Sequence, residues 1–414
     1  MNKLPVSVVF VACLLTSIGL TMGQSQTALV GKSTQAVAAV PDELRPLYRE
    51  LDDTLRQASQ SYPFKKGDPR PLVAPDLSNL FTATSTLDSQ QRWQALLATL
   101  DAYQAMRMNG VSVMIAAPAL TVGDPAPLID FYQRLAKEIH SRDMKLYVEH
   151  FVSPPFSPLA LKGLHDDPQG KKVFLEMIEK ELALIYREIK PDYLSIVTEP
   201  EMTMIRWTHL SFSADELANW VGTVTTHLKS TGASPNTLLG AGAGTWESEE
   251  YGLKFAQQTN LDYVDIHLYA LKLNAEDQVA KLATLVRKVR EARPEMKVTI
   301  GETWLYKHGA EEPKGMFSRE AFFRDNFSFW SPLDERFLNL VMGMAQKEDI
   351  AVVVPYFSQY FFSYYTFGDA ESSKLPPWPG SVPVSWNKAL DSIRNHQLSS
   401  TGRAMSAMLD PVGK

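Results

Sequence analysis

The sequence has almost no cysteine and no excess of basic residues. Its single cysteine, Cys13, lies near the amino terminus, so removal of that segment leaves no thiol for disulfides, thiolate metal sites or a cysteine nucleophile. Lys and Arg number 41 against 47 Asp and Glu, which gives a formal net charge of −6. Nucleic-acid-binding domains and segments that bind anionic membranes normally carry basic faces. We therefore expect neither nucleic acid nor a membrane surface as a partner.

Motifs for three other kinds of chemistry are also missing. There is no His-Glu-x-x-His pair, so we expect no catalytic metal and no other cofactor. There is no Gly-x-Ser-x-Gly elbow, which disfavours an α/β-hydrolase esterase. Gly240-Ala-Gly242-Ala-Gly244 comes nearest to a dinucleotide-binding Gly-x-Gly-x-x-Gly motif, but Thr245 occupies the third glycine position. These glycines instead indicate a strand end at which another backbone approaches closely.

Long uncharged hydrophobic runs are absent except at the amino terminus. Lys3 precedes Val6–Leu20, which is apolar apart from small residues, and Thr21-Met22-Gly23 follows. This order is typical of a secretory signal peptide, which we place at residues 1–23. The run is shorter than the ~20 residues that span a bilayer. We expect an exported protein, extracellular or periplasmic, without stable membrane association. A lipid anchor on Cys13 ranks second.

Short apolar runs alternate with helical periodicity through most of the chain. Hydrophobic residues make up 45% and charged residues 21%, as in globular proteins. Ser213-Ala-Asp-Glu216 has the pattern of a capping box that opens a helix. Eight runs are predicted to be buried strands: Leu72–Leu77, Val111–Ala117, Lys145–Phe151, Tyr193–Val197, Leu238–Ala243, Tyr263–Tyr269, Lys297–Gly301 and Ile350–Phe357.

Eight strands separated by helices predict a (β/α)₈ barrel. The repeat extends from Arg70 to Gly368, close to the ~250 residues that such barrels need. A doubly wound open sheet has the same alternation, but the chain lacks the nucleotide motif that would favour it. Residues 24–69 are predicted to be a linker and a helix that begins near Pro41. Residues 70–414 are predicted to form the barrel with a C-terminal loop and a helix from about Ser385 to Met408.

Two predicted strands end in a glutamate. The fourth strand is followed by Thr198-Glu199-Pro200-Glu201, and the seventh by Gly301-Glu302-Thr303. The active site of a barrel lies at the C-terminal ends of its strands, so these glutamates are predicted to face each other. Paired carboxylates are what glycoside hydrolysis requires, one as acid and the other as nucleophile or base. The alternative for each glutamate is a solvated carboxylate without a catalytic role. Glu201 is the nearest alternative to Glu199.

These motifs resemble those of the clan A glycoside hydrolases, barrel enzymes that include cellulases, mannanases and galactanases. The resemblance implies that Glu199 is the acid/base and Glu302 the nucleophile of a retaining mechanism. His267-Leu-Tyr269 matches a His-x-Tyr motif of strand six, and Val148-Glu149-His150 places a histidine at the end of strand three. Thr198 stands where the clan has asparagine. The clan arginine after strand two is absent, and Arg70 is a candidate replacement.

Several further residues are candidates for binding a sugar. His150, Thr198, His267 and Tyr269 follow from the motifs. The alternative for His267 and Tyr269 is a satisfied core pair, and the alternative for His150 is a histidine that caps a neighbouring loop. Aromatic residues after strand ends can stack on sugar rings or fill the barrel mouth. Among these, Trp304 is the first choice, and Trp246, Tyr356 and Tyr360 follow.

The leading hypothesis is a secreted retaining glycosidase that cleaves β-glycosidic bonds in a poly- or oligosaccharide. The main alternative is a carbohydrate-binding barrel without catalysis, and a third is another barrel hydrolase or lyase that uses the same carboxylates. The glycan and its linkage, endo or exo action and the oligomeric state are left open by the sequence.

Overall fold

The computed structural model describes residues 39–411 except 86, 122, 153–165, 274–275 and 310–317. The predicted signal peptide, Cys13 and most of the predicted linker lie outside the described residues. Among the described helices, none is both long enough and apolar enough to cross a membrane.

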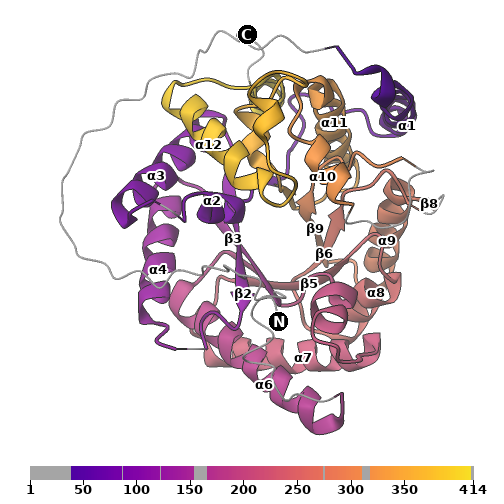
Figure 1. The fold of residues 1–414 in the computed structure, drawn as a ribbon. Helices are drawn as coiled ribbons and strands as arrows, with labels where there is room; N and C mark the ends of the chain where they lie inside the picture. Colours follow the sequence, from indigo (N-terminus) through magenta and orange to yellow (C-terminus); the bar gives the residue numbers. More distant parts are fainter. Residues whose placement is uncertain are drawn as a thin grey trace, which may run out of the picture.

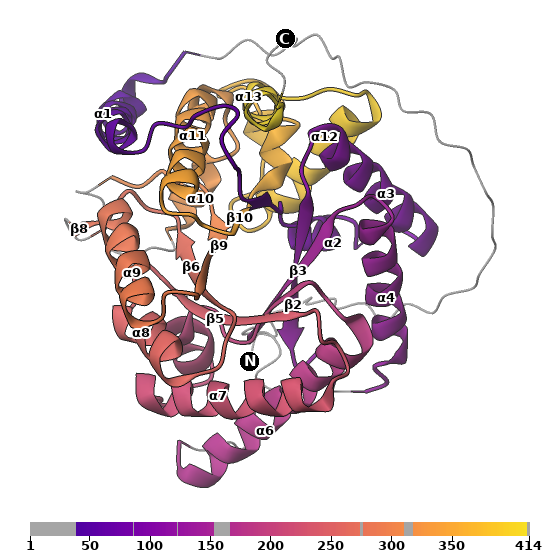
Figure 2. The same ribbon diagram turned by 180° about the vertical axis from the view of Figure 1, so that it is seen from behind.

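Eight parallel strands enclose the centre of the molecule, as Figures 1 and 2 show from opposite sides. Their order in the sheet is β1-β10-β9-β6-β5-β4-β3-β2. A parallel bridge between Asp76 and Ser112 joins the two ends, and the Ser112 amide donates to the Pro75 carbonyl at 3.1 Å. The strands are β1 (Leu72–Val73), β2 (Gly110–Ala117), β3 (Lys145–Val152), β4 (Tyr193–Ser195), β5 (Leu238–Gly244), β6 (Tyr263–Leu268), β9 (Lys297–Thr303) and β10 (Val352–Pro355). The predicted (β/α)₈ barrel is confirmed, and the open sheet is wrong.

Helices surround this barrel (Figure 1). Side-chain caps begin several of them, including a capping box in which Ser213 Oγ and the Glu216 carboxylate each accept a backbone amide hydrogen. The helices are α1 (Arg45–Ser61), α2 (Ser78–Ala83), α3 (Ser89–Ala105), α4 (Ala126–His140), α6 (Pro168–Leu184), α7 (Ala214–Thr231), α8 (Glu249–Gln258), α9 (Gln278–Ala292), α10 (Arg319–Arg324), α11 (Ser331–Lys347), α12 (Ser381–Arg394) and α13 (Ser400–Leu409).

Strand β5 has no room for side chains at its three glycines. A Cβ on Gly242 would lie 1.6 Å from the Asp265 carbonyl oxygen, and one on Gly240 would lie 2.0 Å from the Tyr263 ring. A Cβ on Gly244 would lie 2.2 Å from the Trp246 ring. The close approach predicted for this segment is therefore confirmed, and it lets large polar side chains of β6 fill the barrel.

Two local features differ from the predictions. The single C-terminal helix predicted from about Ser385 to Met408 is two helices, α12 and α13. His396 adopts φ +53°, which ends helical geometry, and Ser399 Oγ then caps α13 by accepting the Gly402 amide. A two-stranded antiparallel sheet of β7 (Lys272–Leu273) and β8 (Glu276–Asp277) follows β6 and was not predicted.

Candidate active site

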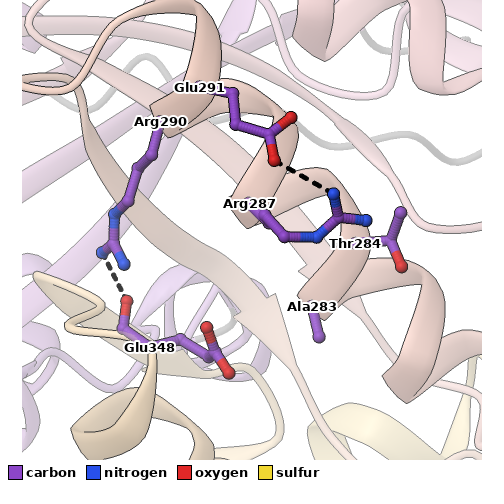
Figure 3. A pocket seen from close by; sticks show the side chains of 6 residues that line it. All are labelled: Ala283, Thr284, Arg287, Arg290, Glu291 and Glu348. Carbon is purple, nitrogen blue, oxygen red and sulfur yellow. Dashed lines mark hydrogen bonds and ion pairs between the residues drawn. The ribbon is translucent and has the colours of Figure 1, made fainter.

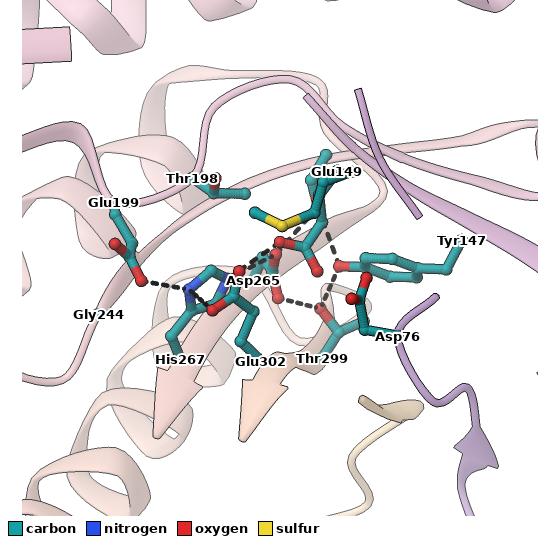
Figure 4. A network of polar contacts seen from close by, with 12 residues as sticks. Asp76, Tyr147, Glu149, Thr198, Glu199, Gly244, Asp265, His267, Thr299 and Glu302 are labelled. Carbon is teal, nitrogen blue, oxygen red and sulfur yellow. Dashed lines mark hydrogen bonds and ion pairs between the residues drawn. The ribbon is translucent and has the colours of Figure 1, made fainter. Parts of the chain in front are cut away.

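The two predicted glutamates meet at one histidine. Glu199 Oε1 lies 2.9 Å from His267 Nδ1, and Glu302 Oε2 lies 3.8 Å from the same nitrogen. Each glutamate is only 6% exposed. Figure 4 shows His267 of β6 between the residues that follow β4 and those of β9. The barrel thus brings both carboxyl groups to the C-terminal ends of its strands, as the sequence predicts.

Tyr269 is also in this cluster. Its hydroxyl donates a 2.6 Å hydrogen bond to Glu302 Oε2. Tyr356 packs edge-on against Tyr269, with ring centroids 6.0 Å apart, and Trp246 lies 5.9 Å from Tyr269. The structure therefore brings the predicted Tyr269, Tyr356 and Trp246 together beside Glu302.

A hydroxyl network lies beneath the glutamates. Ser195 Oγ and Thr299 Oγ1 each donate to the Asp265 carboxylate, at 3.0 and 2.8 Å. Tyr147 and Tyr263 lie within hydrogen-bond distance of Ser195 Oγ, at 2.9 and 3.0 Å. Burial raises the pKa of Asp265, but the adjacent His267 and hydrogen bonds from Thr299 and Ser195 outweigh it, so the pKa is lowered. Asp265 is a fixed negative charge under the site.

His267 carries the compensating positive charge. Burial lowers its pKa, but Glu302, Asp265 and Glu199 together raise that pKa well above its ordinary value. The ring is only 1% exposed, and its Nε2 atom lies 3.5 Å from Asp265 Oδ2. The imidazolium therefore bridges Asp265 below to Glu199 above and holds the Glu199 carboxyl in place.

Burial raises the pKa of Glu302 to about 7, with a further increase from the Glu199 charge. His267 and the Tyr269 hydroxyl act in the opposite direction. A carboxyl group with this pKa is ionised above neutral pH, which a nucleophile requires.

Glu149 is a fourth acid in the cluster that the sequence interpretation missed. It lies on β3, is 1% exposed, and has oxygens within 4.8 Å of ligand atoms of His267 and Glu302. This spacing is compact enough to surround a cation. Both ring nitrogens of His267 already face other carboxyl groups, Nδ1 that of Glu199 at 2.9 Å and Nε2 that of Asp265 at 3.5 Å, so we assign no metal-ligand role to the group. The available signal was a charged residue inside an otherwise apolar strand.

Glu201 has a different environment from Glu199. Glu201 Oε1 accepts the Ser248 amide at 3.0 Å, and Glu247 Oε1 accepts the Glu201 amide at 2.9 Å. These reciprocal bonds join the segment after β4 to the segment after β5. Glu199 has φ +47°, an uncommon conformation that is held by amides of Met202 and Thr203 bonding to its carbonyl. The geometry therefore favours Glu199 over Glu201 as the residue that faces Glu302.

His150 does not lie with the other predicted residues. Neighbouring side chains of a strand point to opposite faces, and Glu149 faces the barrel interior. His150 therefore packs against the helix layer, where its Nε2 lies 3.7 Å from Glu181 of α6. This placement corrects the expectation that His150 lines a sugar site.

Trp304, Tyr360 and Arg70 are also placed elsewhere. Trp304 is 1% exposed and packs against Tyr360 and Phe361, with centroids 5.9 and 5.7 Å away, so no ring face is free for a sugar. Tyr360 is stacked on Tyr364. Arg70 donates to the carbonyl of Leu409 in α13 rather than entering the cluster. Thr198 directly precedes Glu199, is buried, and its carbonyl accepts the Thr203 hydroxyl.

A surface hollow of about 490 Å³ lies beside α9, away from these residues (Figure 3). Arg287 pairs with Glu291 there at 3.1 Å, and Arg290 donates to the Glu348 carbonyl. Its lining residues are Ala283, Thr284, Arg287, Arg290, Glu291 and Glu348. None of them belongs to the glutamate cluster.

No family model and no curated protein sequence matches the chain. Solved structures do match. The virulence factor SghA, in complex with its substrate analogue salicin, is 12% identical, with a TM-score of 0.45 over 82% of this chain and 98% of that chain. The exo-β-1,4-mannosidase Op5Man5 from Opitutaceae bacterium strain TAV5 is 12% identical, with a TM-score of 0.47 over 80% of this chain and 62% of that chain. Fungal β-1,4-galactanases are 12% identical, with a TM-score of 0.46 over 77% of this chain and 99% of that chain.

At 12% identity, these similarities concern the fold alone. The roles of individual residues rest on their own geometry.

Proposed function

We propose that this protein is a retaining glycoside hydrolase that cleaves β-glycosidic bonds, with Glu302 as nucleophile and Glu199 as acid/base. One observation carries the proposal. Two buried glutamates from the ends of β4 and β9 contact the same His267 nitrogen, and Tyr269 donates to Glu302. Two adjacent carboxyl groups with different partners can take the two different roles that a double displacement needs.

The first step breaks the bond between the sugar and the leaving group. Glu302, as carboxylate, attacks the anomeric carbon while the glycosidic oxygen takes the bond electrons and a proton from Glu199. A glycosyl ester on Glu302 results. In the second step Glu199 removes a proton from water, the water oxygen attacks the same carbon, and the Glu302 carboxylate leaves.

The surrounding residues support these steps. The Tyr269 hydroxyl fixes one oxygen of Glu302, so the other is available for attack. The His267 imidazolium orients Glu199 by a charge-assisted hydrogen bond. Trp246 is partly exposed beside both His267 and Tyr269, and Tyr356 is partly exposed beside Tyr269. We assign these two rings to contacts with the apolar face of a sugar.

Export is part of the proposal. The pattern of residues 1–23 is that of a secretory signal, which fits an enzyme that meets polysaccharide outside the cytoplasm. Amino-terminal sequencing of the protein from cell fractions tests this part, and a full-length chain confined to the cytosol would contradict it.

The test of activity uses purified protein with a panel of chromogenic β-glycosides and insoluble polysaccharides. Release of aryl alcohol or reducing sugar supports a glycosidase. Binding of a glycan without release supports the alternative of a carbohydrate-binding barrel.

The stereochemistry of the product is then read by proton NMR. Retaining enzymes hold their carboxyl groups roughly 5–5.5 Å apart, whereas inverting enzymes leave roughly 6.5–9.5 Å for a water molecule. We expect the first product to keep the β configuration. A first-formed α anomer would refute the role of Glu302 as nucleophile.

A further inference from the structure

Glu149 has no ordinary hydrogen-bond donor, although it is buried inside the barrel. Among the described residues, no N–H or hydroxyl group donates to either of its carboxyl oxygens. Its nearest cationic group, His267 Nε2, is 3.7 Å away, beyond hydrogen-bond distance. An ionised carboxylate that is 1% exposed and has no donors would lose its hydration without any compensating hydrogen bond. The environment therefore disfavours a charged Glu149.

The groups around Glu149 are mostly acids or phenols. Glu302 of β9 is near enough that ligand atoms of Glu149, His267 and Glu302 lie within 4.8 Å of one another. The titratable groups that act on Glu149 or are acted on by it are Asp76, Tyr147, Tyr263, Asp265, His267, Glu302 and Tyr356. Only one of these, His267, is a cation, and Asp265 already pairs with it. Two neighbouring carboxyl groups attract each other only when one of them carries a proton.

We propose that Glu149 is a resident carboxylic acid that donates a hydrogen bond to Glu302 and thereby positions the nucleophile. This inference rests on the proposed function for the meaning of Glu302, but the proton itself is a property of the folded chain. Glu149 is a positioning residue, since it acts on the sugar only through Glu302.

The electrostatics agree with the geometry. Burial raises the pKa of Glu149 well above its ordinary value, and the Glu302 charge raises it further. Glu302 accepts the Tyr269 hydroxyl, a donor that favours its ionised form, and the pKa of Glu302 is raised to about 7. Glu149 has no such donor, so the proton of the pair resides on Glu149.

The proton on Glu149 would matter in both chemical steps. Before Glu302 attacks, the hydrogen bond keeps the Glu302 carboxylate ionised and holds its orientation. When the glycosyl ester breaks, the bond electrons return to Glu302, and the Glu149 hydroxyl stabilises the departing carboxylate. Glu149 keeps its proton throughout, so it adds no proton to the balance of the reaction.

The direct test detects the proton and needs no substrate. Protein labelled with ¹³C at the glutamate side-chain carboxyl is examined by NMR at pH 7. We expect a signal at the protonated chemical shift that is absent in Glu149→Gln. If Glu149→Gln removes only a signal of an ionised carboxylate, the proposal is overturned. A stoichiometric divalent cation that is found in the purified protein and lost in Glu149→Gln would also overturn it.

The kinetic test separates donation from mere packing. Glutamine keeps a donor toward Glu302, whereas leucine of similar size does not. The acid limb of the pH profile of kcat/KM reports the ionisation of Glu302. In Glu149→Leu this limb should move to higher pH by about one unit, because Glu302 loses a hydrogen-bond donor. In Glu149→Gln the limb should stay in place, and this variant should retain a larger share of the rate. Equal limbs in both variants would contradict the inference.

Glu181→Gln is the matched control, because Glu181 is equally buried but faces His150 outside the cluster. Its acid limb should equal that of the wild type. If no glycoside is cleaved by any form of the protein, the proposed function fails, and the NMR experiment still decides the inference.

Discussion

At the scale of single residues, the site is a column of alternating charge. Asp265 is held ionised by hydroxyl groups, His267 is held protonated above it, and Glu199 and Glu302 both contact the His267 ring. Each of these buried charges is stable only while its partners remain. Replacing Glu199 and Glu302 one at a time separates their roles.

Glu302→Ala should abolish turnover of every substrate, because no other group is placed to form the glycosyl ester. Glu199→Ala should behave differently on an aryl glycoside with an activated leaving group, since that group needs little protonation. The first step should persist, and added azide should speed the second step because this anion needs no base. Steady-state and burst kinetics with and without azide measure both effects.

Glu201→Ala is the control for this pair. Its side chain binds the Ser248 amide, so we expect a change in stability but no dependence on the leaving group and no azide rescue. If Glu201→Ala shows rescue and Glu199→Ala does not, the wrong glutamate has been assigned.

The motifs at strand ends predicted Glu199, Glu302, His267 and Tyr269, and the structure brings all four together. They misplaced His150 because the face of a strand changes with every residue, and an offset of one exchanges interior for exterior. The same offset concealed Glu149, its neighbour. Trp304 shows a different limit, since whether an aromatic ring is exposed depends on packing by Tyr360 and Phe361 that are distant in the sequence.

At the scale of elements, β5 determines how closely the strands beside the site approach. Its glycines leave the interior free for Asp265 and Tyr263, which hold the hydroxyl network. This explains why a glycine-rich strand is part of the barrel wall, although glycine in the interior of a strand is otherwise unfavourable.

Gly242→Ala should therefore destabilise the fold by about 1–3 kcal/mol or more, because the new methyl group would collide with the Asp265 backbone. Gly222→Ala is the matched control in α7, where a Cβ would meet its nearest atom at 3.4 Å. There alanine should be neutral or stabilise by up to about 1 kcal/mol through helix propensity. Urea denaturation of both variants measures the difference, and equal stabilities would contradict this account of β5.

The alternation of apolar runs located all eight barrel strands, because buried parallel strands are continuously apolar. It did not resolve the break between α12 and α13. That break depends on the backbone of His396 and on the Ser399 cap, and neither interrupts the apolar periodicity. The short β7–β8 sheet was missed for a similar reason, since its residues are mostly polar and exposed.

At the scale of the whole molecule, buried acids make the fold depend on pH. Burial raises the pKa of Asp76 and of Glu247 to about 8, from ordinary values of 3.8 and 4.5. Between the ordinary and the raised pKa, the unfolded chain is ionised while the folded chain keeps the proton. Fewer protons are then bound by the unfolded state, so stability falls as pH rises through this window.

We expect the Tm to fall between pH 5 and pH 8. Each such group lowers the free energy of unfolding by up to about 1.4 kcal/mol per pH unit in this range. His267, with its raised pKa, loses stabilisation in the same direction as pH rises. Asp76→Asn and Glu247→Gln should each give a shallower slope, whatever their stability at pH 5. Differential scanning calorimetry across this range measures the slopes, and a Tm that rises toward pH 8 would refute the assignment of protonated buried acids.

The central claim is that Glu302 becomes covalently bound to the sugar. A 2-deoxy-2-fluoro glycoside with an activated leaving group slows the second step, so the intermediate accumulates. After incubation with the glycoside that the screen identifies, mass spectrometry of the proteolysed protein should find one sugar, attached to the peptide that contains Glu302. Glu302→Gln should remain unlabelled. A label on any other carboxylate, or turnover without a covalent intermediate, would contradict the account.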